Sequence, residues 1–291
     1  MGKTIWELDF YSRPIFDENR KKRWEVLICE SPSDVRRSPD TLFRFSRFTD
    51  HGSVNSAWLK EAIEEAIAQA PASPQKIRFF RRQMNNMIIK ACEDAGIPVA
   101  ASRRTYAIEQ WLTERMREVY PQEPGYDADA AQAAIVQYPA MNAIALPDAV
   151  RGDKADRWAI VTLPAADFQE MPDWDISFGE AFPLEMMGVT PDLPIPGLII
   201  FSPRAIPLAA WLSGLELGYL HLETQPLARI WLETGASDSW ILADLKTPET
   251  LKEGQDFEAA KARAKGVHFL AIQDPKAGET FAGFWLFSKR D

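Results

Sequence analysis

Two arginine pairs follow two short apolar segments, and arginines in that position could bind phosphate. Arg81-Arg82 stand at the end of the segment 76–81, which is typical of a buried strand, and Arg103-Arg104 come just after the segment 97–101. Each pair precedes a stretch with helical periodicity. The first turn of a helix already carries a partial positive charge and free N–H groups, so cations added there are unfavourable unless an anion joins them. Because guanidinium groups match phosphate oxygens, the pattern predicts a phosphate-binding site.

The same spacing has a second explanation, which the sequence leaves open. The arginines could be solvated, or they could pair with nearby carboxylates such as Asp9 or Glu7. If they bind a polynucleotide backbone instead, neighbouring aromatic rings would stack on its bases. The residues predicted to contact such a ligand are Arg78, Arg81, Arg82, Arg103 and Arg104, with Tyr106 and Tyr11 as stacking partners.

Residues for other kinds of chemistry are sparse. Cys29 and Cys92 are the only cysteines, and both lie in apolar segments, which predicts buried thiols and no disulfide framework. His51, His221 and His268 are far apart, and no Cys/His cluster has zinc spacing. The chain lacks a phosphate loop, a dinucleotide fingerprint and a nucleophile elbow. The sequence therefore predicts no catalytic residue, no metal site and no cofactor.

The segment 76–120 must position the arginines, and it is typical of strand, helix, strand, helix. Its apolar residues recur at helical spacing over 84–95, Gly96 follows as a C-cap, and Pro121 ends the last helix. Two parallel strands joined by a helix form a right-handed crossover. Their carboxyl ends should therefore lie side by side, bringing the two arginine pairs together.

Three strands are expected ahead of this unit, at 4–11, 23–30 and 41–48, followed by a helix at 55–70. This order is that of a ribonuclease-H-like fold, with the first strand central. The nuclease version of that fold needs acidic residues that converge on metal ions. Asp9 could supply one, and a helix glutamate another (Glu61, Glu64 or Glu65), but the fourth strand ends in arginines, which would repel a metal. A metal-dependent nuclease remains an alternative function.

The second half is predicted to be an α+β domain with a mixed sheet. We expect strands at 158–163, 197–201, 267–273 and 281–287, a hairpin over 229–245, and helices at 208–220 and 257–265. The predicted domains are 1–121, ribonuclease-H-like and the site of RNA binding; 122–147, a linker with a short helix over 127–138; and 148–291, the α+β domain, of unknown role.

The charge of the chain is uneven. The net charge is −9, but residues 1–120 carry 20 Lys+Arg and 17 Asp+Glu, whereas residues 121–291 carry 13 and 25. Nucleic-acid binding would therefore be local, salt-sensitive and confined to the first half. The acidic half permits another alternative, a scaffold that binds a basic protein partner. No apolar run is long enough to span a membrane, and the N-terminus lacks signal or transit composition, so a cytoplasmic protein is expected.

Three blocks resemble a known family. Trp6-Glu-Leu-Asp-Phe-Tyr-Ser-Arg-Pro14 with Lys22-Arg-Trp-Glu-Val26 looks like its opening signature, and Arg78 to Met84 with Pro98 to Arg104 resembles its middle block. Val267 to Gln273 and Gly283 to Phe287 resemble its C-terminal block. The family is the Tab-two-like (Atab-two) proteins of chloroplasts and cyanobacteria. The blocks occur in the family's order and span both halves of the chain.

This resemblance implies an RNA-binding protein without catalytic residues. It implies activation of translation of photosystem messages, chiefly those of photosystem I, through single-stranded RNA of the 5′ untranslated region, with the ribosome or other translation factors as further partners. The lack of a transit peptide would fit a cyanobacterial member. One departure is Trp285-Leu-Phe287, where the family usually has Trp-Leu-Leu. An apolar residue remains there, so a packing role would survive the change, whereas RNA contact by the third residue would be in doubt.

Overall fold

The computed structural model describes residues 4–131, 143–152, 156–278 and 280–289. The chain divides into two compact units. Unit 1 comprises the described residues of 1–32 and 39–139, and unit 2 those of 33–38 and 140–291. Three β-sheets combine with helices, and each sheet contains both parallel and antiparallel strand pairs. The predicted mixed fold class, α/β with α+β, is confirmed.

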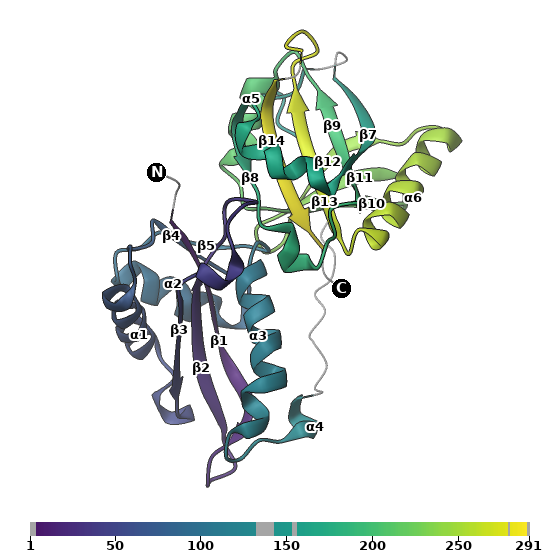
Figure 1. Cartoon of the computed structure of the whole chain (residues 1–291). Helices are drawn as coiled ribbons and strands as arrows, with labels where there is room; N and C mark the ends of the chain where they lie inside the picture. The colour runs from purple at the N-terminus through teal and green to yellow at the C-terminus, as the bar shows by residue number, and fades with distance from the viewer. Residues whose placement is uncertain (1–3, 132–142, 153–155, 279, 290–291) are drawn as a thin grey trace. The chain divides into compact units, whose positions relative to one another are not determined.

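Unit 1 contains a five-stranded sheet whose first strand is central (Figure 1). The order is β3-β2-β1-β4-β5, with β1–β3 antiparallel and with β4 and β5 parallel to β1. This order matches the prediction, while the ribonuclease-H-like assignment remains a prediction. The strands are β1 Ile5–Phe16, β2 Lys22–Glu30, β3 Arg44–Thr49, β4 Lys76–Phe79 and β5 Val99–Ala101.

Three helices cover the sheet of unit 1, close to where their apolar stripes predicted them. They are α1 Ser56–Gln69, α2 Asn85–Asp94 and α3 Tyr106–Glu118. The side chain of Asn55 accepts the N–H of Trp58 and so caps α1. Gly96 ends α2 with φ +72°, a conformation that glycine adopts without strain. Single 3-10 turns lie at Pro39–Thr41, His51–Ser53, Arg82–Met84 and Tyr120–Gln122.

The two faces of β1 bury different kinds of side chain. Trp6, Leu8 and Phe10 join the hydrophobic core under α1 and α2. Glu7 and Asp9 alternate with them and are buried on the opposite face, where α3 packs (Figure 1). Strand alternation therefore directs two carboxylates into the interior, where each needs partners to offset its desolvation.

A buried network of charges supplies the partners of Asp9. Arg13 donates to Asp9 at 2.9 Å and to Glu25 at 3.0 Å, and Glu25 is fully buried. Glu25 also accepts hydrogen bonds from Arg115 of α3 and from the hydroxyl of Tyr120. Because these five residues come from β1, β2, α3 and the turn after it, the network fixes α3 against the sheet.

The predicted linker contains α4 Ala128–Ala131 and the two-residue strand β6 Ile144–Ala145. A short helix was expected over 127–138. Its first turn matches α4, and residues 132–138 of that prediction lie outside the described residues. Strand β6 is an edge strand of a sheet in unit 2, so the end of the predicted linker belongs to the second unit.

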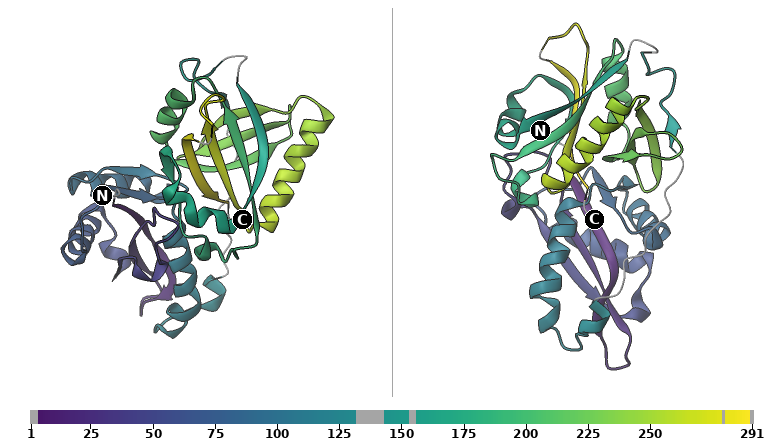
Figure 2. Two further views of the ribbon diagram at one scale, coloured as in Figure 1. Left: turned by 45° about the horizontal axis from the view of Figure 1, so that its top comes forward. Right: turned by 90° about the vertical axis from the view of Figure 1, so that its right-hand side faces the viewer.

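Unit 2 contains two sheets rather than one (Figure 2). The five-stranded sheet has the order β7-β9-β13-β14-β8, and the four-stranded sheet the order β10-β11-β12-β6. Their strands are β7 Arg157–Pro164, β8 Ile176–Glu180, β9 Pro194–Phe201, β10 Leu217–Glu223, β11 Arg229–Thr234, β12 Asp238–Asp244, β13 Val267–Gln273 and β14 Phe281–Ser288. Helices α5 Ala205–Ser213 and α6 Pro248–Arg263 share one hydrophobic core with both sheets, and 3-10 helices occupy Ala165–Asp173 and Leu184–Met187.

The prediction of a helix over 208–220 is wrong in its second half. Helix α5 ends at Ser213, where the N–H of Gly214 bonds to the carbonyl of Trp211, and residues 217–223 form β10. Ser213, Gly214 and Glu216 interrupt the apolar residues here, and Gly214 follows the last residue of α5 as its C-cap, a boundary that the predicted helix ran through. Leu217 and Leu220 have the i, i+3 spacing of one helix face. Both are also buried in the strand, because the pairing of β10 with β11 shifts register between Leu217 and Tyr219.

Three polar side chains close the outer edge of β10. The backbone N–H of Leu220 donates to His268 at 2.8 Å, and Lys261 donates to the carbonyl of the same residue. The N–H of Leu222 donates to Glu258 at 2.8 Å. His268 and Lys261 are both buried. Because β10 is the edge strand of its sheet, these bonds satisfy backbone groups that have no neighbouring strand on that side.

Candidate functional site

The two strand ends predicted to carry the arginines lie next to each other. Phe79 on β4 pairs with Ala101 on β5, and the N–H of Ser102 donates to the carbonyl of Phe79 at 2.9 Å. Arg81 and Arg103 therefore follow neighbouring strand ends. The prediction that the two arginine pairs follow adjacent strand ends is confirmed.

Arg81 is held by the sheet itself. Its Nε donates to Asp9 at 2.6 Å, and its guanidinium carbon lies 4.3 Å from the ring centroid of Tyr11. Burial disfavours the charged form of Asp9, but the guanidinium groups of Arg13 and Arg81 outweigh it and lower the pKa of Asp9 below its ordinary value of 3.8. For Arg81, the structure therefore shows the carboxylate pairing that the sequence left open.

The other predicted contact residues differ in exposure. Arg78, Arg104 and Tyr106 are buried, whereas Arg82 and Arg103 are partly exposed, as is Arg81. The guanidinium of Arg104 lies over the ring of Tyr106 at 5.5 Å. Whether any of the six contacts RNA stays a prediction. In this fold, solvent reaches Arg81, Arg82 and Arg103, whereas the other three side chains are buried in the interior of unit 1.

The first turn of α3, where the sequence predicted an external phosphate, instead donates a hydrogen bond to a buried carboxyl group of the same unit. Glu7 accepts the N–H of Ile108 at 2.9 Å and the hydroxyl of Ser31 at 2.7 Å. Burial raises the pKa of Glu7 to about 7, although these two bonds and the charge of Arg78 favour ionisation. An N–H group in the first turn of α3 is therefore satisfied by a carboxyl oxygen from β1, a contact that the sequence analysis did not predict.

Three of the carboxylates proposed for a nuclease, Asp9, Glu64 and Glu65, form ion pairs. Asp9 is bound by two arginines, while on the exposed side of α1 Glu64 pairs with Lys60 and Glu65 with Arg47. Among the residues that the structure describes, no three His, Cys, Asp or Glu side chains are grouped as metal ligands. The arrangement at Asp9 favours a structural role, because a metal ion would have to displace both guanidinium groups.

Sequence reasoning missed Phe80, which lies between the end of β4 and Arg81. Its side chain is 43% exposed. The residues 76–81 were expected to form a buried strand, which includes this ring. Burial in fact stops at Phe79, where β4 ends. Nothing in the local residue types marked that boundary.

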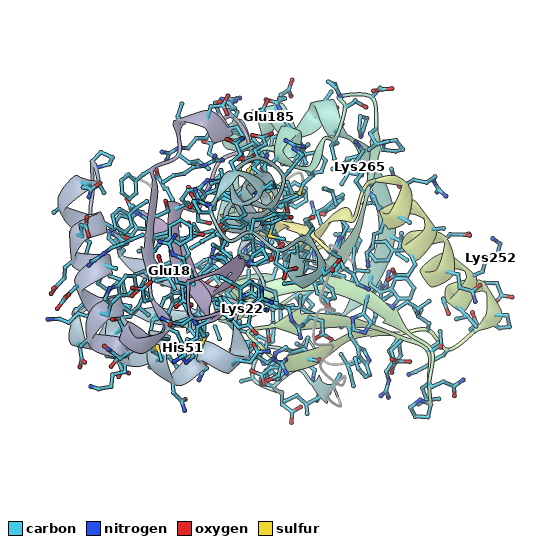
Figure 3. The ribbon with its side chains drawn as sticks, turned by 90° about the horizontal axis from the view of Figure 1, so that it is seen from below. Glu18, Lys22, His51, Glu185, Lys252 and Lys265 are labelled. Carbon is cyan, nitrogen blue, oxygen red and sulfur yellow. The ribbon has the colours of Figure 1, made fainter. Side chains whose placement is uncertain are left out.

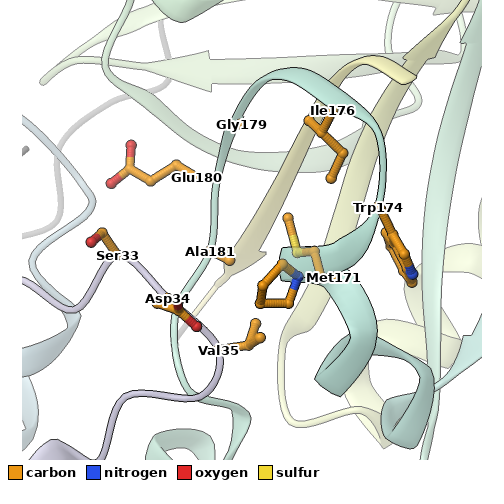
Figure 4. Close-up of a pocket in the computed structure, with 10 residues that line it drawn as sticks. Ser33, Asp34, Val35, Met171, Trp174, Ile176, Gly179, Glu180 and Ala181 are labelled. Carbon is orange, nitrogen blue, oxygen red and sulfur yellow. The ribbon is translucent and has the colours of Figure 1, made fainter. Parts of the chain in front are cut away.

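Unit 2 contains an open cavity beside β8 (Figure 4), with a volume of about 240 Å³. Arg36 anchors the loop on one side of it by donating to Asp173 at 2.5 Å and to the carbonyl of Gln169 at 2.7 Å. The cavity is lined by carboxyl, apolar and backbone groups that define no particular ligand. They belong to Ser33, Asp34, Val35, Met171, Pro172, Trp174, Ile176, Gly179, Glu180 and Ala181.

The surface of unit 2 carries charged side chains that point to solvent. Lys252 on α6 is one of them (Figure 3); it pairs with Asp256 one turn along and is 72% exposed. Within the described ranges, no helix combines the length and the apolar character needed to cross a membrane.

The C-terminal tripeptide that departs from the family pattern is part of the core. Trp285, Leu286 and Phe287 lie on β14 and are 3%, 0% and 0% exposed. Trp285 and Phe287 belong to the core shared by the two sheets of unit 2. The replacement of Leu by Phe at the third position is therefore a change in core volume.

Comparison with known proteins identifies relatives along the whole chain. The family described as "RNA-binding protein Tab2/Atab2" matches with its N-terminal region at residues 5–115 and with its C-terminal domain at residues 133–288. Two proteins named "Protein TAB2 homolog, chloroplastic", from Arabidopsis thaliana and Zea mays, are 36% and 35% identical to it. Both alignments cover 97% of this chain, and they cover 73% and 70% of the respective relatives.

Among solved structures, the HTLV-2 integrase catalytic core domain in complex with magnesium aligns with a TM-score of 0.25 and 14% identity. It covers 44% of this chain and 77% of that one, a similarity too weak to support an argument. The family matches and the two relatives agree with the blocks seen in the sequence. This chain belongs to the Tab2/Atab2 family of RNA-binding proteins.

Proposed function

We propose that this protein binds single-stranded RNA in the 5′ untranslated region of photosystem messages, chiefly those of photosystem I, and activates their translation. The observation that carries the proposal is the match to an RNA-binding family in both halves of the chain. The two relatives are chloroplast proteins by name, which fits a role in photosynthesis. The ribosome or other translation factors would be further partners, and the cytoplasm is the proposed compartment.

The RNA would contact unit 1 at the ends of β4 and β5. Arg82 and Arg103 are partly exposed there, and the side chain of Arg81 is 29% exposed. A chain with a net charge of −9 gains little from bulk attraction to RNA, so a local group of cations must supply the phosphate contacts. The pairing of Arg81 with Asp9 and Tyr11 holds one of these cations in a fixed position, which reduces the entropy cost when RNA binds.

Crosslinking of bound RNA in the cells that make the protein tests the proposal. The expected result is enrichment of 5′ untranslated regions of photosystem I messages over their coding regions, with crosslinked peptides mapping to unit 1. In a cell-free translation reaction, added protein should raise synthesis from a reporter that carries such a leader and not from one with a scrambled leader. Recovery of RNA without leader enrichment would leave RNA binding in place and refute the assigned target.

A further inference from the structure

The exposed ring of Phe80 has a place in the fold that suits a nucleobase. Phe80 is the one aromatic residue among the large, exposed apolar side chains of the described chain; the others are Ile144, Ile206 and Leu227. Single exposed apolar residues are common on protein surfaces, so exposure alone does not identify a site. A second observation is that Phe80 lies beside the two predicted arginine pairs in the backbone.

Phe80 directly precedes Arg81 and Arg82 in the chain. The carbonyl of the preceding residue, Phe79, accepts the N–H of Ser102, which places the Phe80 backbone beside the residue that precedes Arg103. Phe80 therefore lies at the two adjacent strand ends that Arg81, Arg82 and Arg103 follow in the chain, and all three arginines are partly exposed. This combination of an aromatic face with surrounding cations is typical of surfaces that bind single-stranded nucleic acid.

The ring of Phe80 is also available for stacking. Within the part of the chain that the structure describes, no aromatic or cationic side chain stacks on it; the guanidinium of Arg81 lies over Tyr11 instead. Tyr106, which the sequence suggested as a stacking partner, is 4% exposed and lies beneath Arg104. The stacking role therefore shifts from Tyr106 to Phe80.

We infer that Phe80 stacks on a base of single-stranded RNA while the arginines at the two strand ends contact the flanking phosphates. This inference rests on the proposed RNA-binding function and names the residue that would read a base rather than the backbone. Every base presents an aromatic face, so the contact would be tolerant of sequence and strongest with the purines.

Binding of the full chain to two RNA probes tests this inference. One probe is an oligoadenylate and the other has the same length and backbone but abasic riboses. The variant Phe80→Leu removes the ring and keeps an apolar side chain, Phe80→Trp keeps an aromatic face, and Ile206→Ala is the matched control, an exposed apolar residue on α5.

Phe80→Leu should weaken oligoadenylate binding about fivefold to 150-fold, the range found when one stacking ring is removed. It should leave binding to the abasic probe unchanged, and Phe80→Trp and Ile206→Ala should bind both probes as the wild type does. Equal binding of oligoadenylate by wild type and Phe80→Leu would overturn the stacking role while leaving RNA binding established. A wild-type chain that binds neither probe nor leader RNA would refute the proposed function itself. Unfolding midpoints of all variants, expected to match the wild type, exclude misfolding as the cause.

Discussion

The carboxylate of Glu7 on β1 accepts the backbone N–H of Ile108, in the first turn of α3, at 2.9 Å. The bond joins the central strand of unit 1 to the helix that follows the second arginine pair. Burial raises the pKa of Glu7 to about 7 from its ordinary value of 4.5. The folded protein therefore holds a proton on Glu7 more tightly than the unfolded chain does.

The stability contributed by Glu7 should be complete below pH 4.5 and should be lost as the pH rises through 7. Glu7→Gln removes this titration. Between pH 4.5 and pH 8 the wild type should lose, relative to the variant, on the order of 3 kcal/mol in the free energy of unfolding. Urea unfolding of both proteins at several pH values measures the difference, and parallel curves would contradict the raised pKa.

Asp9→Asn should strongly destabilise unit 1. The substitution leaves Arg13, which is 2% exposed, without one of its two carboxylate partners and removes the carboxylate that binds Arg81. Breaking a buried ion pair from one side costs about 3–5 kcal/mol in the free energy of unfolding. Glu64→Gln is the control, because Glu64 forms an exposed pair with Lys60 and should change stability by less than about 1 kcal/mol. Chemical denaturation compares the two variants.

Acid should weaken unit 2 through His268. Burial, with the charge of Lys261, lowers the pKa of His268 well below 6.5, so the folded state binds fewer protons than the unfolded chain. Stability is therefore present above pH 6.5 and falls as the pH drops below it, by up to about 1.4 kcal/mol per pH unit. His268→Gln should show a smaller loss between pH 7 and pH 5. Hydrogen exchange at Leu220, whose N–H donates to His268, provides a local measurement.

Arg82 and Arg103 should contribute to RNA affinity through charge. Replacing either by Ala should weaken binding to leader and scrambled RNA alike, and should reduce the slope of log affinity against log salt by about 0.7 for each phosphate that the variant no longer neutralises. Arg81→Ala should do the same and also destabilise the fold, because it removes a partner of Asp9. Lys252→Ala on α6 is the control cation. An unchanged salt slope in all three arginine variants would show that RNA binds elsewhere.

Phe287 should respond to substitution as a core residue. Its side chain is fully buried on β14, so Phe287→Ala should reduce the free energy of unfolding by about 3–5 kcal/mol. Phe287→Leu, which restores the usual family residue, retains much of the volume and should be tolerated better. RNA affinity per folded molecule should be the same in both. A loss of affinity in a fully folded Phe287→Leu protein would indicate direct RNA contact instead.

Local patterns were sufficient to predict most of unit 1. The stripe of apolar residues placed α1, Gly96 ended α2, and the crossover rule brought the ends of β4 and β5 together. These features depend on residues a few positions apart, or on the order of the elements. The partners of Arg81 were harder to determine: Asp9 lies 72 positions away, and both solvation and carboxylate pairing were compatible with the sequence.

Long-range contacts explain what the sequence did not predict. Leu217 to Glu223 became a strand because β11 pairs with it and because His268 and Lys261, more than 40 residues further on, bond its outer edge. The exposure of Phe80 depends on where β4 stops, and a run of two Phe residues contains no mark of that point. The second sheet of unit 2 depends on the same kind of pairing.

The burial of Trp285, Leu286 and Phe287 also bears on how such proteins could diverge. Selection on a buried tripeptide acts on how well its side chains fill the core. Its persistence among related chains would therefore indicate a shared fold and not a shared target transcript. Changes in the choice of transcript could then accumulate on the surface while this interior segment stayed the same.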